Sequence, residues 1–283
     1  MILTDSTAAR VQGSTVLGII SVSSTFLQFM QYAAITVSTA ISGTIGIVKN
    51  GIGGLTLSGI CNYTGPTQIN AGQLAISSAS TLNGVISGAG SLAKIGTTNL
   101  TLGASNTYSG GTLSGPTAAS GTIAFSQNNA FGTGLFTSAG PSQIICNATS
   151  TLSNNFQINF SNSLQFRVTA VSLTLTILGN ISGSGSISKT SNGRLNLDGT
   201  LSYTGSTTIT AGTLRTIKTT GASTATATFS TSLSVSFNVA PTAGMTFRFF
   251  QGSTTNTYAS VTLVGAPGRT GTYNSANSTL TIA

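Results

Sequence analysis

One motif occurs three times in this chain, with its residues at the same spacing each time. The copies open at Ile41, Ile86 and Ile181, and in each of them Lys follows at +8, Leu at +14 and +16, Tyr at +22 and Gly at +24. Self-similarity at fixed offsets indicates a repeat architecture, in which one unit stacks on the next. The residues at these positions, which we expect to be structural, are Lys49, Lys94, Lys189, Leu55, Leu100, Leu195, Tyr63, Tyr108 and Tyr203.

The pattern inside each copy is that of short strands. Apolar residues alternate with Ser, Thr or Asn, as in Leu55-Thr-Leu57 and Leu195-Asn-Leu197, which is the period of a strand and not of a helix. Gly, Asn and Ser-Gly clusters between these runs supply turns. Each copy is expected to form about two short turns of a coil that bury their apolar side chains only by stacking. The gap between the second and third copies has room for one degenerate copy, around residues 135–178.

Composition agrees with an all-β fold. The chain has 35 Gly, only 4% charged residues and no Glu, whereas exposed helix faces are normally filled with charged helix formers. An apolar content of 39%, regularly spaced, is too high for a disordered linker. We therefore expect a folded solenoid of roughly ten coils, stacked about 4.8 Å apart.

The motif also resembles a known family. The pattern I-S-G-x-G-x-(L/I)-x-K, L-T-L, (T/S)-Y-(T/S)-G and A-G-x-L is similar to the autotransporter-associated β-strand repeat of secreted bacterial passenger proteins. The resemblance covers residues 41–214, and residues 245–282 resemble the closing segment of such passengers. It implies a right-handed parallel β-helix. The expected organisation is a capping or attachment segment (1–40), a repeat β-helix (41–220) and a C-terminal β closing segment (221–283).

The first 40 residues differ from the rest. Asp5 offsets Arg10, so the start is a poor signal peptide. The uncharged span 17–37 is too diluted by Ser, Thr and Gln to be expected to cross a membrane. Residues from Phe26 to Ala34 have roughly helical spacing after Ser24, a suitable N-cap, so either a short helix or a pair of strands could cap the first coil.

The chain is basic, with ten Lys and Arg, two acids and a net charge of +8. Lys49, Lys94 and Lys189 are expected as solvated residues at corresponding corners of different coils, or alternatively as the contact for an acidic partner. Nucleic acid is not expected, because the charges are spread thinly and are not clustered with aromatic residues. Cys61 and Cys146 are expected to be separate buried thiols and not a disulfide.

Residues that could perform chemistry are scarce. Asp5 and Asp198 are the only acids and there is no His, so we expect no catalytic residues, no metal site, no cofactor and no enzyme activity. Asp198, which precedes Gly199, is expected to bond the local backbone of a turn. The repeated tyrosines are expected to stack as a ladder at one edge of the coils, with an exposed carbohydrate-binding row as the alternative.

These expectations favour a structural protein of a virion surface, either a phage head decoration or fibre or a tail fibre or spike. The unprocessed start at Met1 and the lack of a translocator barrel after Ala283 favour this setting. The expected partners are further copies, as a homotrimer, other virion proteins and a host-surface glycan. The alternative is a secreted bacterial adhesin or surface-filament subunit of the passenger type. A polysaccharide-cleaving tailspike is disfavoured by the number of acids.

Overall fold

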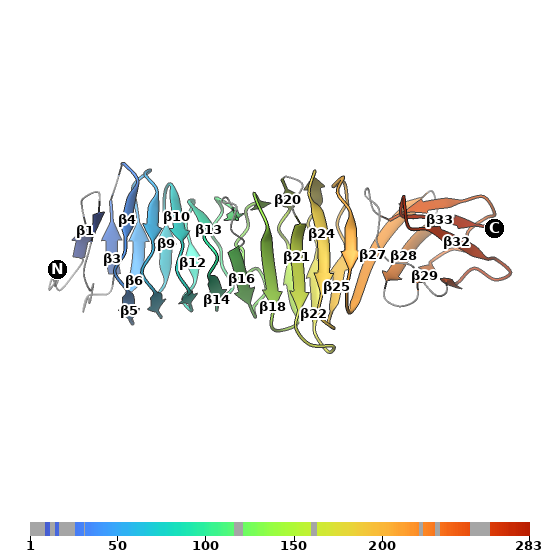
Figure 1. The fold of residues 1–283 in the computed structure, drawn as a ribbon, viewed down its shortest axis with the longest axis horizontal. Helices are drawn as coiled ribbons and strands as arrows, with labels where there is room; N and C mark the ends of the chain where they lie inside the picture. The colour runs from blue at the N-terminus through green and yellow to red at the C-terminus, as the bar shows by residue number, and fades with distance from the viewer. Residues whose placement is uncertain are drawn as a thin grey trace.

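The structure, a computed structural model, describes residues 9–11, 15–16, 26–30, 32–115, 121–159, 163–220, 223–229, 233–249 and 261–283. Every regular element of these residues is a β-strand, and most are stacked in parallel as a solenoid of about nine turns. Figure 1 shows an elongated rod with the two termini at opposite ends. The expectation of an all-β solenoid is confirmed.

The coils form three faces, and most coils contribute one strand to each face. The first face begins with the five strands β1 (Ala9–Val11), β3 (Phe26–Phe29), β6 (Gly46–Lys49), β9 (Thr67–Ile69) and β12 (Ile86–Ser87). The second face is a sheet of nine strands: β2 (Thr15–Val16), β4 (Ile35–Val37), β7 (Leu55–Leu57), β10 (Gln73–Ile76), β13 (Ser91–Lys94), β15 (Thr112–Ser114), β17 (Phe136–Ser138), β20 (Phe156–Ile158) and β23 (Ile181–Gly183).

The third face starts with the pair β5 (Ile41–Gly43) and β8 (Cys61–Tyr63). It continues as a sheet of seven strands: β11 (Ser80–Leu82), β14 (Asn99–Leu102), β16 (Gly121–Phe125), β18 (Ser142–Cys146), β21 (Ser163–Val168), β24 (Ser186–Thr190) and β26 (Thr207–Ile209). Beyond β12 the first face runs through irregular backbone, where Asn129 N–H donates to Thr151 O and Asn106 N–H to Asn129 O. It then resumes as β19 (Ser150–Leu152), β22 (Thr174–Ile177), β25 (Arg194–Leu197) and β27 (Thr213–Thr220).

The core is a column of inward side chains. Strand β7 is representative: Leu55 and Leu57 are fully buried, Thr56 faces outward, and Leu55 pairs with Ile35 on one side and Leu74 on the other. The repeated leucines of the other copies lie in the same way, and each faces an apolar residue of the next coil. These pairs are Leu100 with Ile123 and Leu195 with Leu214.

Coils differ in length, and phenylalanine fills the longer ones. Paired residues are 18 positions apart at Leu74 and Leu92 but 25 apart at Phe156 and Ile181. In the longer coils a run of phenylalanine rings packs along the core, with successive ring centroids 4.8 to 6.0 Å apart. The stretch expected to hold a degenerate copy therefore continues the solenoid with aromatic filling. The rings belong to Phe125, Phe131, Phe136, Phe156 and Phe166.

The N-terminal alternatives are settled in favour of strands. Phe26–Phe29 forms β3, which pairs in parallel with β1 and β6, and Leu27 and Phe29 point into the core. Strand β4 likewise joins β2 and β7, so these residues form a coil of the solenoid itself. Across the described residues no helix is both long and apolar enough to cross a bilayer. Asp5 and the Ser24-Thr25 pair lie outside the described residues.

The three sequence copies begin on three different faces. Ile41 opens the first copy in β5 on the third face, Ile86 opens the second in β12 on the first face, and Ile181 opens the third in β23 on the second face. The reason is arithmetic: a step of 45 residues is longer than two coils of about 20 residues but shorter than three. The repeat residues are therefore not on corresponding corners, as the sequence had suggested, but are rotated by one face from copy to copy.

Parallel stacking ends at β27. This strand pairs in parallel with β25 on one side and antiparallel with β28 (Ser223–Phe229) on the other, and β29 (Leu233–Phe237) and β31 (Val261–Val264) follow in the same sheet. A small antiparallel sheet of β30 (Thr246–Arg248), β33 (Thr279–Ile282) and β32 (Gly271–Asn274) packs beside it through Phe237 and Phe247, whose ring centroids are 5.2 Å apart. These strands occupy the edge of β27 that a further coil would otherwise use.

Candidate functional site

The repeat lysines are buried inside the corners of the solenoid. The side chain of Lys49 is fully buried at the end of β6, and its Nζ donates to the carbonyls of Gly51 and Ala71, both at 2.7 Å. Lys189, also fully buried, donates to the carbonyls of Thr190, Ser191 and Ala211 at 2.8, 2.6 and 3.3 Å. Each ammonium thus joins the turn after its own strand to the turn of the next coil. We call this arrangement the lysine clamp.

The A-G of the motif forms the other half of the clamp. Ala71 and Ala211, each 22 residues after its lysine, supply the accepting carbonyl. The glycines that follow have φ of +65° at Gly72 and +76° at Gly212, a region that side chains disfavour. A Cβ at Gly72 would also lie 2.7 Å from Lys49 Nζ. The lysine and the A-G pair of the motif therefore form one contact between coils, which only the register of the coils reveals.

The second copy has a modified clamp. Position 116, which is 22 residues after Lys94, is Pro116 in place of Ala and lies outside the described residues. Lys94 is fully buried all the same, and its Nζ donates to Ile95 O, to Thr98 Oγ1 at 3.3 Å and to Ile76 O of the preceding coil at 3.4 Å. The ammonium is again satisfied by neutral oxygen atoms.

The expectation of solvated lysines was wrong. Turn carbonyls replace water around each ammonium, and burial lowers the pKa of Lys49, Lys94 and Lys189 from 10.5 to about 8. No described carboxylate accepts a bond from these groups. Because they are buried, these three lysines also do not offer a surface for an acidic partner.

The repeat tyrosines are buried as well. Tyr63, Tyr108 and Tyr203 have no exposed surface, and each hydroxyl bonds the Oγ1 of the threonine four residues later, at 2.7, 2.6 and 2.5 Å. Burial raises the pKa of all three. Neither an exposed carbohydrate row nor a stacked ladder is formed, because the rings are buried in different coils on different faces. The threonines, which extend the motif to Y-(T/S)-G-x-T, are Thr67, Thr112 and Thr207.

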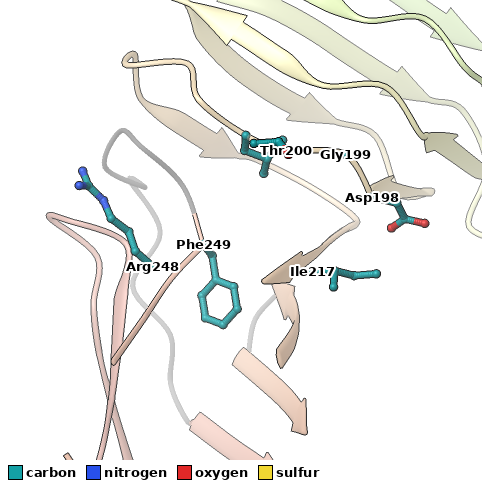
Figure 2. Close-up of a pocket in the computed structure, with 7 residues that line it drawn as sticks. Asp198, Gly199, Thr200, Ile217, Arg248 and Phe249 are labelled. Carbon is teal, nitrogen blue, oxygen red and sulfur yellow. The ribbon is translucent and has the colours of Figure 1, made fainter. Parts of the chain in front are cut away.

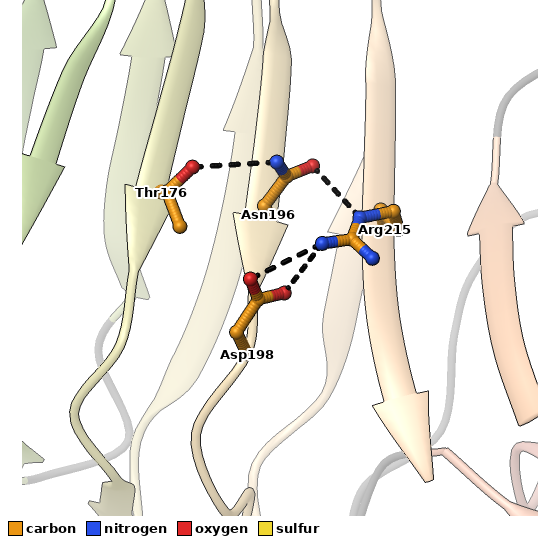
Figure 3. A network of polar contacts seen from close by, with 4 residues as sticks. All are labelled: Thr176, Asn196, Asp198 and Arg215. Carbon is orange, nitrogen blue, oxygen red and sulfur yellow. Dashed lines mark hydrogen bonds and ion pairs between the residues drawn. The ribbon is translucent and has the colours of Figure 1, made fainter. Parts of the chain in front are cut away.

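Asp198 does not bond the local backbone as expected. Its two carboxylate oxygens accept from Nη2 of Arg215 on the next coil, at 2.9 and 3.1 Å. Nε of Arg215 donates to Asn196 Oδ1, and Asn196 donates in turn to Thr176 Oγ1, both at 3.3 Å. Figure 3 shows this row of polar contacts crossing three neighbouring strands of the first face. It lies half-buried on the outside of the sheet and ties β22, β25 and β27 together.

A pocket of about 280 Å³ lies beside this row, where the last coils meet the C-terminal strands. Figure 2 shows Asp198 and Thr200 from the end of β25 and its turn, Ile217 from β27, and Arg248 and Phe249 from the C-terminal sheet around it. Asp198 is the single acidic side chain among the described residues, and it is already paired with Arg215. The pocket therefore lacks the second carboxylate that glycoside hydrolysis normally requires.

Two further observations concern metal and thiol chemistry. The described part of the chain contains no group of three His, Cys, Asp or Glu side chains that could hold a metal ion. Cys61 and Cys146 are free and buried, as expected, and burial raises the pKa of both thiols. Their sulfurs donate to the carbonyls of Gly59 and Ala148. Buried, protonated thiols of this kind are structural and not nucleophilic.

The clamped coils lie in segments of the chain that match the model of a known repeat family. Three segments of the chain match the passenger-associated-transport-repeat. They are residues 47–76, 92–113 and 187–215, well under half of the chain. Each match begins two residues before a clamp lysine, and the first and third end one or two residues after the Leu of A-G-x-L. No curated protein and no solved structure matches the chain.

The match confirms the resemblance to the repeats of autotransporter passengers. Such repeats belong to secreted passenger domains, which agrees with an extracellular or cell-surface setting. The comparisons lend no support to the virion setting, the phage context or the homotrimer that we expected from the sequence. They fit the alternative, a passenger-type surface protein, better.

Proposed function

We propose that this chain is a non-enzymatic scaffold outside the bacterial cell, an adhesin or surface-filament subunit of the autotransporter-passenger type. The observation that carries the proposal is the coincidence of the three family matches with the clamped coils of one continuous solenoid. A repeat that is matched in sequence and that also buries its lysine against backbone carbonyls in each copy is more than a chance resemblance.

The physical properties of the rod suit such a role. Each coil contacts its neighbours, so the solenoid can present a long side surface without long-range packing. The buried lysines, tyrosines and leucines of the motif all serve cohesion between coils, which leaves the outward positions of the strands free for recognition. The outward residues are mostly Ser, Thr, Asn and Gln, so the surface is hydrated and weakly charged.

The proposal is tested by asking where the protein is found. Antibodies against the purified chain should label intact cells of the source bacterium, and protease added outside should remove the label. Labelling only after permeabilisation, or recovery of the chain in purified virions, would contradict the proposal. The non-enzymatic part is tested separately: release of oligosaccharides from surface polysaccharides incubated with the pure chain would overturn it.

A further inference from the structure

A polar groove of about 340 Å³ lies on the outside of the third face. It crosses four neighbouring strands, β16, β18, β21 and β24, and so runs along the axis of the rod. The described side chains that line it are all neutral: Thr122, Pro141, Ser142, Gln143, Ser163, Gln165 and Ser188.

Four of these residues form a row in strict register. Thr122 pairs with Gln143, Gln143 with Gln165, and Gln165 with Ser188, each in adjacent strands. All four are half-buried and face outward between buried neighbours. The row therefore repeats its hydrogen-bonding groups once per coil, about every 4.8 Å along the rod. That interval is comparable to the length of one sugar ring in an extended glycan.

The groove has hydrogen-bonding capacity that the protein leaves unused. Gln143 Nε2 donates to Gln165 Oε1, which fixes the two amides side by side. Among the described residues, Gln143 Oε1 and Gln165 Nε2 then have no partner, so one acceptor and one donor face the groove. The hydroxyl oxygen of Ser163 is buried in the groove wall and likewise has no partner in the part of the chain that the structure describes. A hydroxyl of this kind is available to a bound molecule or to water that reaches the groove wall.

The chemistry of the lining selects the ligand class. None of the lining side chains that the structure describes is charged, and Arg167, which follows in β21, donates to Ser191 instead, so the groove is not built for phosphate or carboxylate. Among the described lining residues Pro141 is the single apolar side chain, and the remaining carbon surface belongs to Gln, Thr and Ser, so no wholly apolar face is offered to a lipid or a hydrophobic peptide. Strands β18 and β21 are hydrogen-bonded on both sides, so no peptide strand can add there. A polymer that carries many neutral hydroxyl groups is the ligand class that fits these constraints.

We propose that the groove binds a neutral polysaccharide, whose chain lies along the rod with its hydroxyl groups bonded to the Thr122–Gln143–Gln165–Ser188 row. The described lining side chains include no aromatic ring for stacking, so a single site is weak, and many copies displayed on one surface supply avidity. The inference names a ligand class for the proposed surface scaffold and rests on that function only for its biological setting, since binding is a property of the purified chain.

The test is affinity electrophoresis of the purified full chain in native gels that contain dextran, laminarin or galactomannan. At least one of these neutral polymers should retard the protein, and the double variant Gln143→Leu/Gln165→Leu should weaken that binding by at least about tenfold. The matched control is Gln157→Leu, an outward, half-buried glutamine in β20 on the second face, which should bind as the parent does. Thermal unfolding checks that each variant is folded.

A second pair of substitutions, Thr122→Val and Ser188→Val, leaves the amide pair intact and should weaken binding in the same way. Retardation by none of the three polymers would overturn the inference, as would equal retardation of the groove variants and the control. Retardation by heparin alone, equal in all variants and abolished by salt, would show a general cation effect and would also overturn it. None of these outcomes changes the labelling of intact cells, so the two proposals fail separately.

Discussion

Substitution of Gly72 by alanine tests the lysine clamp at a point where a side chain would meet the ammonium directly. The backbone at Gly72 has φ of +65°, and a Cβ there would lie 2.7 Å from Lys49 Nζ and 2.5 Å from Ile52 O. Neither the backbone carbonyl nor the bonded ammonium can move away without cost. The alanine side chain should therefore push Lys49 away from Ala71 O and loosen the contact between two coils.

The expected magnitude follows from these contacts. A left-handed conformation costs an alanine about 1–2 kcal/mol. Loss of one hydrogen bond from a charged donor adds about 1.5–3 kcal/mol. Gly72→Ala should thus lower the free energy of unfolding by about 2.5–5 kcal/mol. Gly54→Ala is the control, because its Cβ would meet nothing closer than Ala34 Cβ at 4.0 Å and its φ is not positive.

Urea unfolding followed by circular dichroism measures both variants. In a Lys49→Met background the cost of Gly72→Ala should fall by about 1.5 kcal/mol or more, because the displaced hydrogen bond is already absent. Equal costs for Gly72→Ala and Gly54→Ala, or an unchanged cost in the Lys49→Met background, would refute the view that lysine and A-G form one contact.

Three further predictions concern the polar groups of the solenoid. Stability should rise from about pH 7.5 to between pH 9 and 10: the folded pKa of the three lysines is about 8 and the unfolded pKa 10.5, so the unfolded chain binds more protons in that window. Each lysine contributes at most about 1.4 kcal/mol of stability per pH unit. Urea midpoints measured against pH under reducing conditions give this slope, and Lys94→Met should remove about a third of it. A stability that does not change with pH in this window would contradict the prediction. Above that range stability should fall, since the cysteines and tyrosines have raised pKa values and the unfolded chain loses their protons first. Tyr63→Phe should lower the free energy of unfolding by about 1–3 kcal/mol, because Thr67 is left buried without its partner. The double variant Tyr63→Phe/Thr67→Val should recover part of that loss, and no recovery would count against the pairing. Asp198→Asn should lower the free energy of unfolding by no more than about 1 kcal/mol, and by less at high salt, because the ion pair is partly exposed. A larger loss in thermal unfolding would contradict this and would mean that the polar row in Figure 3 holds the coils together more strongly.

The local structure could be predicted from the sequence because it depends on neighbours in the chain. Alternation such as Leu55-Thr-Leu57 places side chains on opposite faces of a strand whatever its partners are. The same alternation also predicts that the lysine side chains point inward. The side chain of Ile47 points into the core, and that of Lys49, two residues later, points the same way. Ile187 and Lys189 are related in the same manner. That signal was present and was outweighed by the general rule that lysine is exposed.

The remaining features depend on how coils lie against each other. The pairing of Asp198 with Arg215, and of Lys49 with Ala71, requires the number of residues per coil, which varies along the rod. The shift of the three copies from one face to the next also follows from the number of residues per coil. The polar groove could not be foreseen either, because Gln143 and Gln165 become neighbours only through the register of β18 and β21.

The most direct test of the account is a titration of the lysine side chains by NMR, with ¹³C labels at the ε-carbons. The chain has four lysines, Lys49, Lys94, Lys189 and Lys218. Three signals should titrate near pH 8, and Lys49→Met, Lys94→Met and Lys189→Met should each remove one of them. If all the lysine signals of the folded chain titrate near pH 10.5, the lysines are solvated, and the clamp that connects the motif to the fold does not exist.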